Sequence, residues 1–319
     1  MENTNEMLTA SARALVTEIE SVVIGKHNEI VLLVTALLSG GHVLIEDVPG
    51  TGKTTLAAAL AKAAGLKFNR AQFTPDVMAS DITGFNVYNR QTESFSFKEG
   101  LVMTNILLAD EINRASPKTQ SALLEAMEEA KVTVDGVTYP VPEPFFVIAT
   151  QNPTGYVGTY PLPEAQLDRF ALRLSMGYPT VEEEVHILSD RQKVNPLEKV
   201  RAVTDIQAIR TLRAMVQNVT VTPEIARYIV ELVHATRKSR KLSLGASPRA
   251  SLLIMKLAQA YAFLRERDYV KPEDVAFVFI PGIAHRVVLS QEARLNRESA
   301  QTILGEILHQ VEVPYQGGR

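Results

Sequence analysis

The sequence of 319 residues contains no cysteine and no long hydrophobic run. The absence of cysteine excludes disulfide bonds and thiolate metal sites, and it suits a reducing compartment such as the cytoplasm. No apolar segment approaches the ~18 residues that a membrane-spanning helix needs. The first residues are polar and acidic, unlike a secretory signal. We therefore expect a cytoplasmic chain without a membrane span.

An excess of charge of either sign is also missing. The 33 Lys and Arg residues nearly balance the 36 Asp and Glu residues, which gives a formal net charge of −3. Bulk attraction to nucleic acid or to an anionic membrane is therefore not expected. Apolar residues make up 46% of the chain and charged residues 22%, as in ordinary globular proteins. The length allows two domains, and we find no internal repeat.

Residues 43–64 have the pattern of a phosphate-binding loop. An apolar run at 43–45 predicts a short buried strand, and an alanine-rich segment at 56–64 predicts a helix. The turn between them supplies the expected nucleotide-binding residues Pro49, Gly50, Thr51, Gly52, Lys53, Thr54 and Thr55. The two glycines let backbone N–H groups approach a polyphosphate, and the N-terminus of the helix adds partial positive charge.

Two side chains of this loop have distinct expected roles. Lys53 would reach the β- and γ-phosphates, and the hydroxyl of Thr54 would bind Mg²⁺. The sequence departs from the usual motif at one position, because Asp47 stands where a first glycine is expected. The intact part of the motif supplies most phosphate contacts, so an ordinary glycine turn is the weaker interpretation.

Two carboxylates follow the apolar run at 105–109, namely Asp110 and Glu111. We expect this strand to lie beside the loop strand in a parallel sheet, with ligands bound at the carboxyl ends of both. Asp110 would then hold Mg²⁺, directly or through water. Glu111 would orient and deprotonate the attacking water.

A neutral amide, Asn152, follows the next core strand at 145–150. It could hydrogen-bond the attacking water or the γ-phosphate without adding charge. Gln151 is the alternative for this role, and an Asx turn before Pro153 is the purely structural interpretation.

Two arginines are candidates for a contact with a transferring phosphate. Arg169 precedes the last short strand, and Arg249 lies in the first turn of a predicted helix. A cation is poorly placed at a helix N-terminus, which favours an anionic partner for Arg249. Surface ion pairs are the alternative for both.

The pattern of elements predicts an α/β domain followed by a helical one. Two β-hairpins are expected, at 84–98 and at 131–141, and the second has an Asp-Gly turn. Beyond Pro179, apolar stripes at helical spacing predict helices, one of them started by Ser247 and Pro248 and carrying Leu252, Leu253 and Leu257. We place a nucleotide-binding domain at 1–178 and a helical lid domain at 179–319.

These motifs, in this order, resemble the AAA+ ATPases. The segments 110–115 and 164–170, together with the hairpins before the acidic strand and before the Asn152 strand, are similar to the MoxR family over about 22–297. The resemblance implies the roles of Walker A for Lys53 and Thr54, Walker B for Asp110 and Glu111, sensor 1 for Asn152, sensor 2 for Arg249 and arginine finger for Arg169. Arg114 is a second, lower-ranked candidate for a contact with a neighbouring subunit, and Val23, Ile24 and Gly25 resemble the segment near adenine.

The resemblance also implies a parallel-sheet P-loop domain with two hairpin inserts and an all-α lid. ATP and Mg²⁺ are the implied cofactors, hydrolysed in a ring, usually a hexamer, with nucleotide between neighbouring subunits. Family members act like chaperones that mature or activate protein complexes, often with a partner that carries a von Willebrand factor A domain. Whether Arg249 acts within its own chain or on a neighbour stays open.

Three other functions are compatible with these residues. The first is a slow nucleotide switch that serves as an assembly scaffold, although Glu111, Asn152 and Arg169 together favour hydrolysis. The second is a nucleic-acid motor, for which the only notable basic run, 237–241, is better explained as a solvated loop. The third is the ATPase subunit of a magnesium-chelatase-like complex, or an activator of Rubisco or nitric-oxide reductase.

Overall fold

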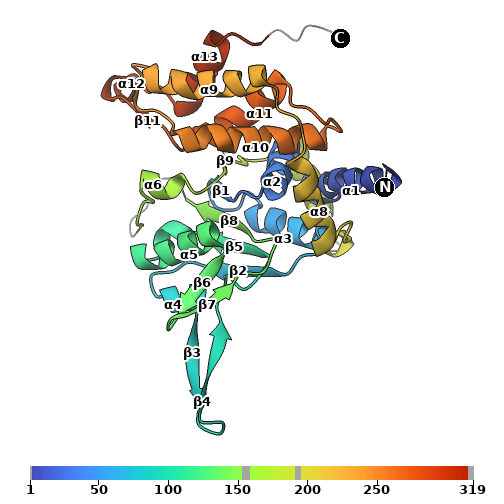
Figure 1. Ribbon diagram of the computed structural model, residues 1–319, viewed down its shortest axis with the longest axis vertical. Helices are drawn as coiled ribbons and strands as arrows, with labels where there is room; N and C mark the ends of the chain where they lie inside the picture. Colours follow the sequence, from blue (N-terminus) through green and yellow to red (C-terminus); the bar gives the residue numbers. More distant parts are fainter. Residues whose placement is uncertain (1, 153–158, 191–194, 315–319) are drawn as a thin grey trace.

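Five parallel strands form the centre of the lower half of the molecule (Figure 1). The computed structural model describes residues 2–152, 159–190 and 195–314. The strand order in the sheet is β2-β5-β8-β1-β9. These strands are β2 (Phe68–Gln72), β5 (Ile106–Asp110), β8 (Phe146–Gln151), β1 (Val43–Glu46) and β9 (Leu172–Leu174).

The prediction that the acidic strand lies beside the loop strand is wrong. β8 pairs with β1 on one side and with β5 on the other, so it separates them. The chain reaches β5 from β2 and returns to the centre of the sheet only with β8. The end of β8, which carries Gln151 and leads to Asn152, therefore lies between the phosphate loop and the carboxylates.

Side chains alternate across the sheet because successive residues of a strand point to opposite faces. Ile106 and Leu108 of β5 belong to the hydrophobic cluster that continues into the lid, whereas Leu107 belongs to the cluster on the other face. Both faces are buried, as expected for a parallel sheet. The helices and 3₁₀ turns that accompany the sheet are α1 (Glu2–Glu20), α2 (His27–Ser39), α3 (Lys53–Ala63), α4 (Ala79–Thr83), η1 (Ile112–Arg114), α5 (Pro117–Glu129) and α6 (Glu164–Leu167).

The predicted hairpins are present. One consists of β3 (Gly84–Asn89) and β4 (Ser94–Glu99), and it extends away from the lid (Figure 1). The other consists of β6 (Lys131–Val134) and β7 (Val137–Pro140). Its turn residues have positive φ, 49° at Asp135 and 80° at Gly136, the conformation that Asp-Gly turns favour.

A helical lid covers the end of the sheet opposite the hairpins (Figure 1). The elements after β9 are α7 (Val181–Asp190), η2 (Pro196–Lys199), α8 (Ile206–Val216), α9 (Pro223–Lys238), β10 (Leu242–Leu244), α10 (Pro248–Leu264), α11 (Pro272–Ile283), β11 (Val288–Leu289), α12 (Gln291–Leu295) and α13 (Ala300–Gln310). None of the helices in the described ranges is long and apolar enough to cross a membrane.

Three details of the lid differ from expectation. The lid is not entirely helical, because β10 and β11 pair as a short antiparallel sheet. Ser247 precedes α10, but its side chain makes no capping hydrogen bond. Leu252 is exposed and lines the pocket of Arg169 and Arg249, while Leu257 is buried. The expected apolar stripe of this helix is therefore rotated, since α10 packs against both α2 and α11.

His42 connects three elements beneath the lid. Its Nδ1 accepts a hydrogen bond from the backbone N–H of Val147 at 3.0 Å, so Nε2 carries the proton and donates to the Met127 carbonyl at 3.1 Å. The neutral ring thereby joins the start of β1 to β8 and to the end of α5. Burial lowers the pKa of His42 to about 4, because the charged form would lose its hydration.

Acidification should destabilise the protein through this histidine. In the unfolded chain His42 titrates near the ordinary value of about 6.5, so below that pH the unfolded state binds the proton first. The stabilising contribution is complete above pH 6.5 and is lost toward pH 4, with about 2 kcal/mol lost by pH 5. Urea unfolding at pH 7 and pH 5 measures this difference.

The His42→Gln variant provides the control, because it lacks a group that titrates in this range. His285 is also buried with a lowered pKa and adds pH dependence of the same sign in both proteins. Wild type should therefore lose more stability than the variant between the two pH values. An equal loss in both would show that His42 does not titrate as described.

Candidate active site

A pocket of about 430 Å³ lies at the carboxyl ends of the central strands. The loop between β1 and α3 forms one wall, and the ends of β2, β5 and β8 form the other. Its lining includes the predicted residues Pro49, Gly50, Gly52, Lys53, Thr54, Thr55, Asp110, Glu111 and Asn152. The structure thus brings together most of the residues singled out in the sequence.

The backbone of the loop is shaped to surround an anion. Gly50 and Gly52 have φ values of 89° and 88°, a left-handed conformation that favours glycine. A Cβ placed on Gly50 would meet no atom within 4 Å, so the backbone there borders open space. Thr51 is buried within the loop and does not line the pocket. α3 begins at Lys53, which directs a helix N-terminus toward the pocket.

The side chain of Lys53 folds onto its own loop. Its Nζ donates to the carbonyl oxygens of Val48 at 2.7 Å and Asp47 at 3.0 Å. Burial lowers its pKa, while the charges of Asp47, Asp110 and Glu111 oppose that shift. The ammonium group is therefore stabilised mainly by backbone carbonyls and neighbouring carboxylates.

Asp47, the departure from the usual motif, ties the loop to the segment that follows β9. Its Oδ1 accepts from the N–H of Val48 at 2.8 Å, and its Oδ2 accepts from the N–H groups of Met176 at 2.6 Å and Gly177 at 2.7 Å. A glycine at this position could make none of these bonds. A buried carboxylate with three backbone donors is well stabilised, so Asp47 fixes the loop to the connection with the lid.

Asp110 is held at the end of β5 by two side chains. It accepts a hydrogen bond from Thr150 Oγ1 at 2.6 Å, and Arg70 Nη2 lies 2.9 Å from its other oxygen. Neither Thr150 nor Arg70 was singled out in the sequence. Both lie within strands that neighbour β5, a relation that only the strand order makes visible.

Glu111 is held in an unusual conformation between two donors. Its φ is 55°, uncommon for a residue other than glycine. Its backbone N–H donates to Thr150 Oγ1 at 2.8 Å, Asn152 Nδ2 donates to one carboxylate oxygen at 3.1 Å, and Arg114 Nη1 donates to the other at 3.0 Å. Strained backbone at a polar cleft is typical of functional sites.

The donors in this pocket suit Mg²⁺ bound together with phosphate. No group of three or more His, Cys, Asp or Glu side chains that could hold a metal is present in the described part of the chain. The hydroxyl of Thr54 and the carboxylate of Asp110 line the same pocket. Mg²⁺ commonly takes one or two such protein ligands and completes its shell with phosphate oxygens and water, so these residues fit the ion.

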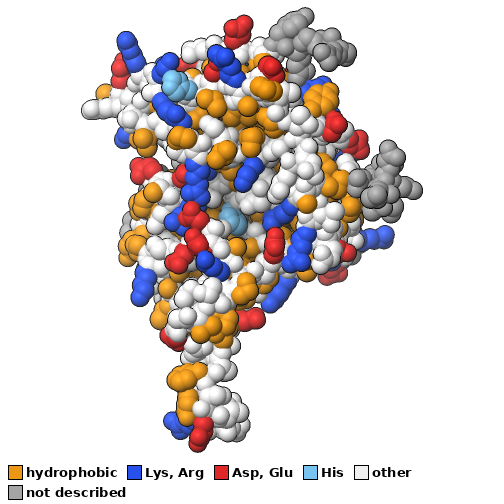
Figure 2. Space-filling view, in the orientation of Figure 1, with side chains coloured by type: hydrophobic (Ala, Val, Ile, Leu, Met, Phe, Trp, Pro, Cys, Tyr) orange, Lys and Arg blue, Asp and Glu red, His pale blue; other side chains and the backbone are white. Residues whose placement is uncertain are grey.

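Both candidate arginines lie in a different pocket, of about 390 Å³, which shares no lining residue with the first. Arg169 Nη1 lies 3.0 Å from one oxygen of Glu128, and Arg249 Nη2 lies 3.1 Å from the other. Arg169 also donates to the Leu124 carbonyl at 2.7 Å. Figure 2 shows basic and acidic side chains alternating where the lid meets the base. The anionic partner of Arg249 within the chain is therefore Glu128.

The segment that carries Arg169 is anchored to the lid. Arg286, which follows α11, lies 2.8 Å from Asp168 Oδ1 through its Nε. Its Nη2 donates to the carbonyl oxygens of Asp168 at 2.9 Å and Phe170 at 2.6 Å. The backbone on both sides of Arg169 is thus bonded to a buried lid residue.

The predicted adenine-binding residues do not line the pocket that contains Lys53; these residues are Val23, Ile24 and Gly25. Val23 is buried, and the carboxylate of Glu183 in α7 lies directly over Gly25, with no room for a Cβ. The segment therefore packs against the start of the region that follows β9.

Comparisons with known proteins agree with this geometry. Residues 42–172 match the ATPase family associated with various cellular activities (AAA), and residues 234–307 match the AAA lid domain. The chain is 51% identical over 301 residues to the uncharacterized protein YeaC of Bacillus subtilis, covering 94% of both chains. It is 41% identical over 306 residues to the chaperone MoxR1 of Mycobacterium tuberculosis, covering 93% of this chain and 81% of the other. A crystal structure from Cytophaga hutchinsonii matches with a TM-score of 0.90 and 37% identity over 98% of both chains.

Proposed function

Because the chain belongs to the MoxR family of AAA+ ATPases, we propose that it binds ATP with Mg²⁺ and hydrolyses it in a ring, usually a hexamer, to remodel, mature or activate a partner protein complex. The observation that carries the hydrolytic part is the single pocket lined by Lys53, Thr54, Asp110, Glu111 and Asn152. Together these residues supply groups for binding phosphate, for holding Mg²⁺ and for activating water, the parts that phosphoryl transfer uses.

Each residue has a proposed task. The N–H groups of the loop and Lys53 bind the β- and γ-phosphates, and Thr54 and Asp110 hold Mg²⁺, which neutralises developing phosphate charge when bound. Glu111 orients and deprotonates water, and Asn152 fixes the Glu111 carboxylate through the bond at 3.1 Å. Arg114 donates to the other oxygen of Glu111, so the two donors orient the carboxylate while each oxygen keeps a lone pair for the proton of water.

Glu111→Gln should bind ATP as wild type does and lose most turnover, about a hundredfold or more, because the base is removed while Asp110 and Lys53 remain. Lys53→Ala should weaken binding itself. Fluorescent-nucleotide titration and phosphate release measure the two properties separately. Hydrolysis at the wild-type rate by Glu111→Gln would refute the assignment of the base.

We further propose that a neighbouring subunit completes the site. Arg169 and Arg249 lie together in a pocket separate from that of Lys53, which supports contacts in trans for both. We rank Arg169 above Arg114 as the arginine finger, because Arg114 pairs with the proposed base Glu111 of its own chain, whereas Arg169 pairs with Glu128 outside the pocket of Lys53. In a ring, the γ-phosphate of the neighbour would replace Glu128 as the anion that these cations face.

Activity per subunit should rise with protein concentration as rings assemble. Arg169→Ala should bind ATP normally and hydrolyse it slowly, because a finger contributes orders of magnitude in rate. Mixing it with the inactive Lys53→Ala variant should restore activity, since some interfaces then combine an intact Lys53 with an intact Arg169. Specific activity that stays flat on dilution, without rescue on mixing, would place Arg169 outside any intersubunit site.

The hairpins are the proposed contact with the client. Phe95 and Tyr88 of the β3–β4 hairpin are exposed and pack against each other at 5.2 Å between ring centroids. Phe97 of β4 stacks on Tyr139 of β7 with centroids 3.9 Å apart, which supports joint action of the two hairpins. Exposed aromatic side chains on a protruding element suit a protein partner.

Shortening the β3–β4 tip at 90–93 should leave basal ATPase largely intact and impair binding of the client, measured by pull-down. A control variant replaces residues 90–93 by a Gly-Ser turn of the same length. It shows whether the client needs the length of the hairpin or the side chains at its tip. Loss of folding, seen by circular dichroism, would show that the hairpin is structural instead.

We propose the partner from the resemblance to the family alone. A von Willebrand factor A domain protein is the expected co-partner, and the chelatase-like or Rubisco and nitric-oxide-reductase activator complexes remain alternatives that a pull-down would separate. A role on nucleic acid is disfavoured, since Lys241 in the basic run forms ion pairs with Glu298 and Glu306. A slow nucleotide switch that serves as a scaffold is the other alternative, and the measured rate of ATP hydrolysis would distinguish it from an active ATPase.

We keep the domain division at 1–178 and 179–319 and the cytoplasmic location as proposals. The match to the AAA lid domain at residues 234–307 lies wholly within the second part, which supports the division. Extensive packing of α2 on α10 means that the first part also contacts the lid closely.

A further inference from the structure

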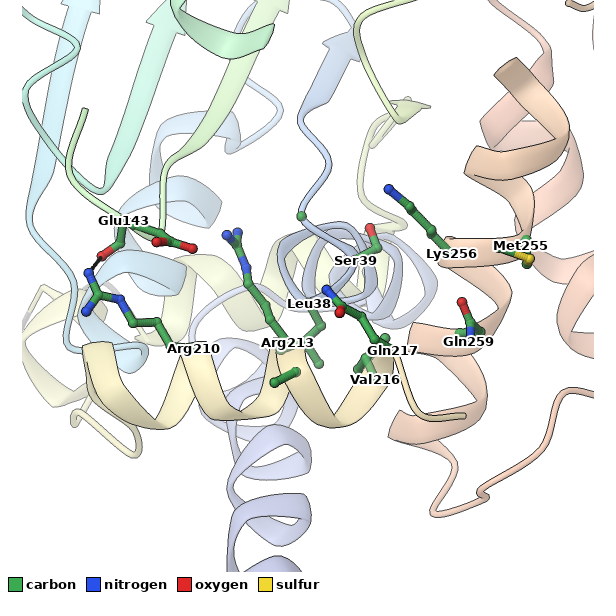
Figure 3. A pocket seen from close by; sticks show the side chains of 12 residues that line it. Leu38, Ser39, Glu143, Arg210, Arg213, Val216, Gln217, Met255, Lys256 and Gln259 are labelled. Carbon is green, nitrogen blue, oxygen red and sulfur yellow. Dashed lines mark hydrogen bonds between the residues drawn. The ribbon is translucent and has the colours of Figure 1, made fainter. Parts of the chain in front are cut away.

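A larger pocket, of about 650 Å³, lies between α8, the C-terminal end of α2 and α10 (Figure 3). It shares no lining residue with the pocket that contains Lys53, and it adjoins the pocket of Arg169 and Arg249, whose lining also includes Ser39, Gly40 and Lys256. The segment before β8, which carries Glu143, closes one end. No part of the proposed hydrolytic chemistry uses this pocket.

Three cations surround it without carboxylate partners. Arg210 and Arg213 come from α8, and Lys256 comes from α10. Within the described ranges, none of the three forms an ion pair with a side-chain carboxylate. Glu143 is the one acid among the lining residues, so the pocket has three positive groups against one negative group in a chain whose net charge is −3.

Arg213 is the central group. Its Nε donates to the carbonyl of Leu37 at the end of α2, at 2.9 Å. Its Nη2 is buried and has no hydrogen-bond partner. A buried charged donor without a partner is costly, and in native proteins it commonly marks the place of a water or an ion. The Nη end of a guanidinium group fits the paired oxygens of a phosphate.

The carboxylate of Glu143 would compete with a bound phosphate for the guanidinium group of Arg213. Figure 3 shows its carboxylate turned toward the guanidinium group of Arg213, yet no ion pair joins them within 4 Å. The backbone carbonyl of Glu143 accepts from Arg210 Nη2 at 2.7 Å, which fixes the segment. Removal of this negative charge should therefore strengthen the binding of an anion, whereas removal of the cations should weaken it.

The remaining lining suits the organic part of a small ligand. Leu38, Val216 and Met255 supply apolar surface, and Gln217 supplies an amide at the edge. The volume is in the range of ordinary small-molecule sites. A free phosphate would use only the cationic side, and a phosphorylated organic molecule would use both.

We propose that this pocket binds a small phosphorylated anion between α2, α8 and α10. The ligand places its phosphate on Arg213 and Lys256 and its organic part on the apolar wall. Because α2 belongs to the first part of the chain and α10 to the lid, a bound ligand also stabilises their packing.

Calorimetric titration with pyrophosphate in Mg²⁺-free buffer tests this proposal. The Lys53→Ala variant is the background, so that the phosphate loop does not contribute to the signal. Lys256→Gln and Arg213→Gln should each weaken binding about tenfold, the effect of losing one charged hydrogen bond. Glu143→Gln should tighten binding several-fold. Lys238→Gln, which removes an exposed lysine of α9 outside the pocket, should leave it unchanged.

Adenosine monophosphate, titrated in the same background, separates the two sources of phosphate. Tighter binding than pyrophosphate supports a phosphorylated organic ligand, whereas weaker binding would show that only the cationic side contributes and would overturn the contact with the apolar wall. No pyrophosphate binding up to millimolar concentration, or equal weakening by Lys238→Gln and Lys256→Gln, would overturn it. Lys256 also lines the pocket of Arg169 and Arg249, so Arg210→Gln, which removes an exposed cation of the proposed pocket alone, keeps the test valid even if Arg213→Gln unfolds. None of these measurements uses ATP hydrolysis, so failure here leaves the proposed ATPase function untouched.

Discussion

The common direction of the five strands is the constraint on which the site depends. Parallel strands deliver all their carboxyl ends to one edge, so residues more than 100 positions apart in the chain meet there. One side chain of β8 orients both acids, because the hydroxyl of Thr150 donates to Asp110 and accepts from the N–H of Glu111. Without β8 between β1 and β5, both acids would lose their hydrogen bonds to Thr150.

The lid is bonded to the base at the two places where polar chemistry is concentrated. Asp47 binds the phosphate loop to Met176 and Gly177, at the start of the connection to the lid. On the other side, Arg286 binds the backbone around Arg169. The two sets of residues that a ring would bring together across subunits are therefore both coupled, within one chain, to the same layer of helices.

Much of this was predictable from sequence because local patterns dictated it. The strand, turn and helix around Lys53 and the Asp-Gly hairpin are short-range signals, and both elements are confirmed. Strand order was not predictable, since it depends on which crossover the chain takes, and Thr150 and Arg70 were missed for that reason. The exposure of Leu252 was missed because Leu252 and Leu253 are adjacent but point to different sides of α10, and only packing selects the buried side.

The two hydrogen bonds from Lys53 to the carbonyls of Val48 and Asp47 make ligand binding an exchange of partners. An anion that binds Lys53 must replace the two hydrogen bonds that the lysine already makes to carbonyl oxygens of the loop. A lone phosphate gains little in such an exchange, whereas a chain of phosphates reaches the lysine, the glycine N–H groups and the helix terminus together. In the proposed ATP complex, the loop would therefore favour several linked phosphates over a single phosphate.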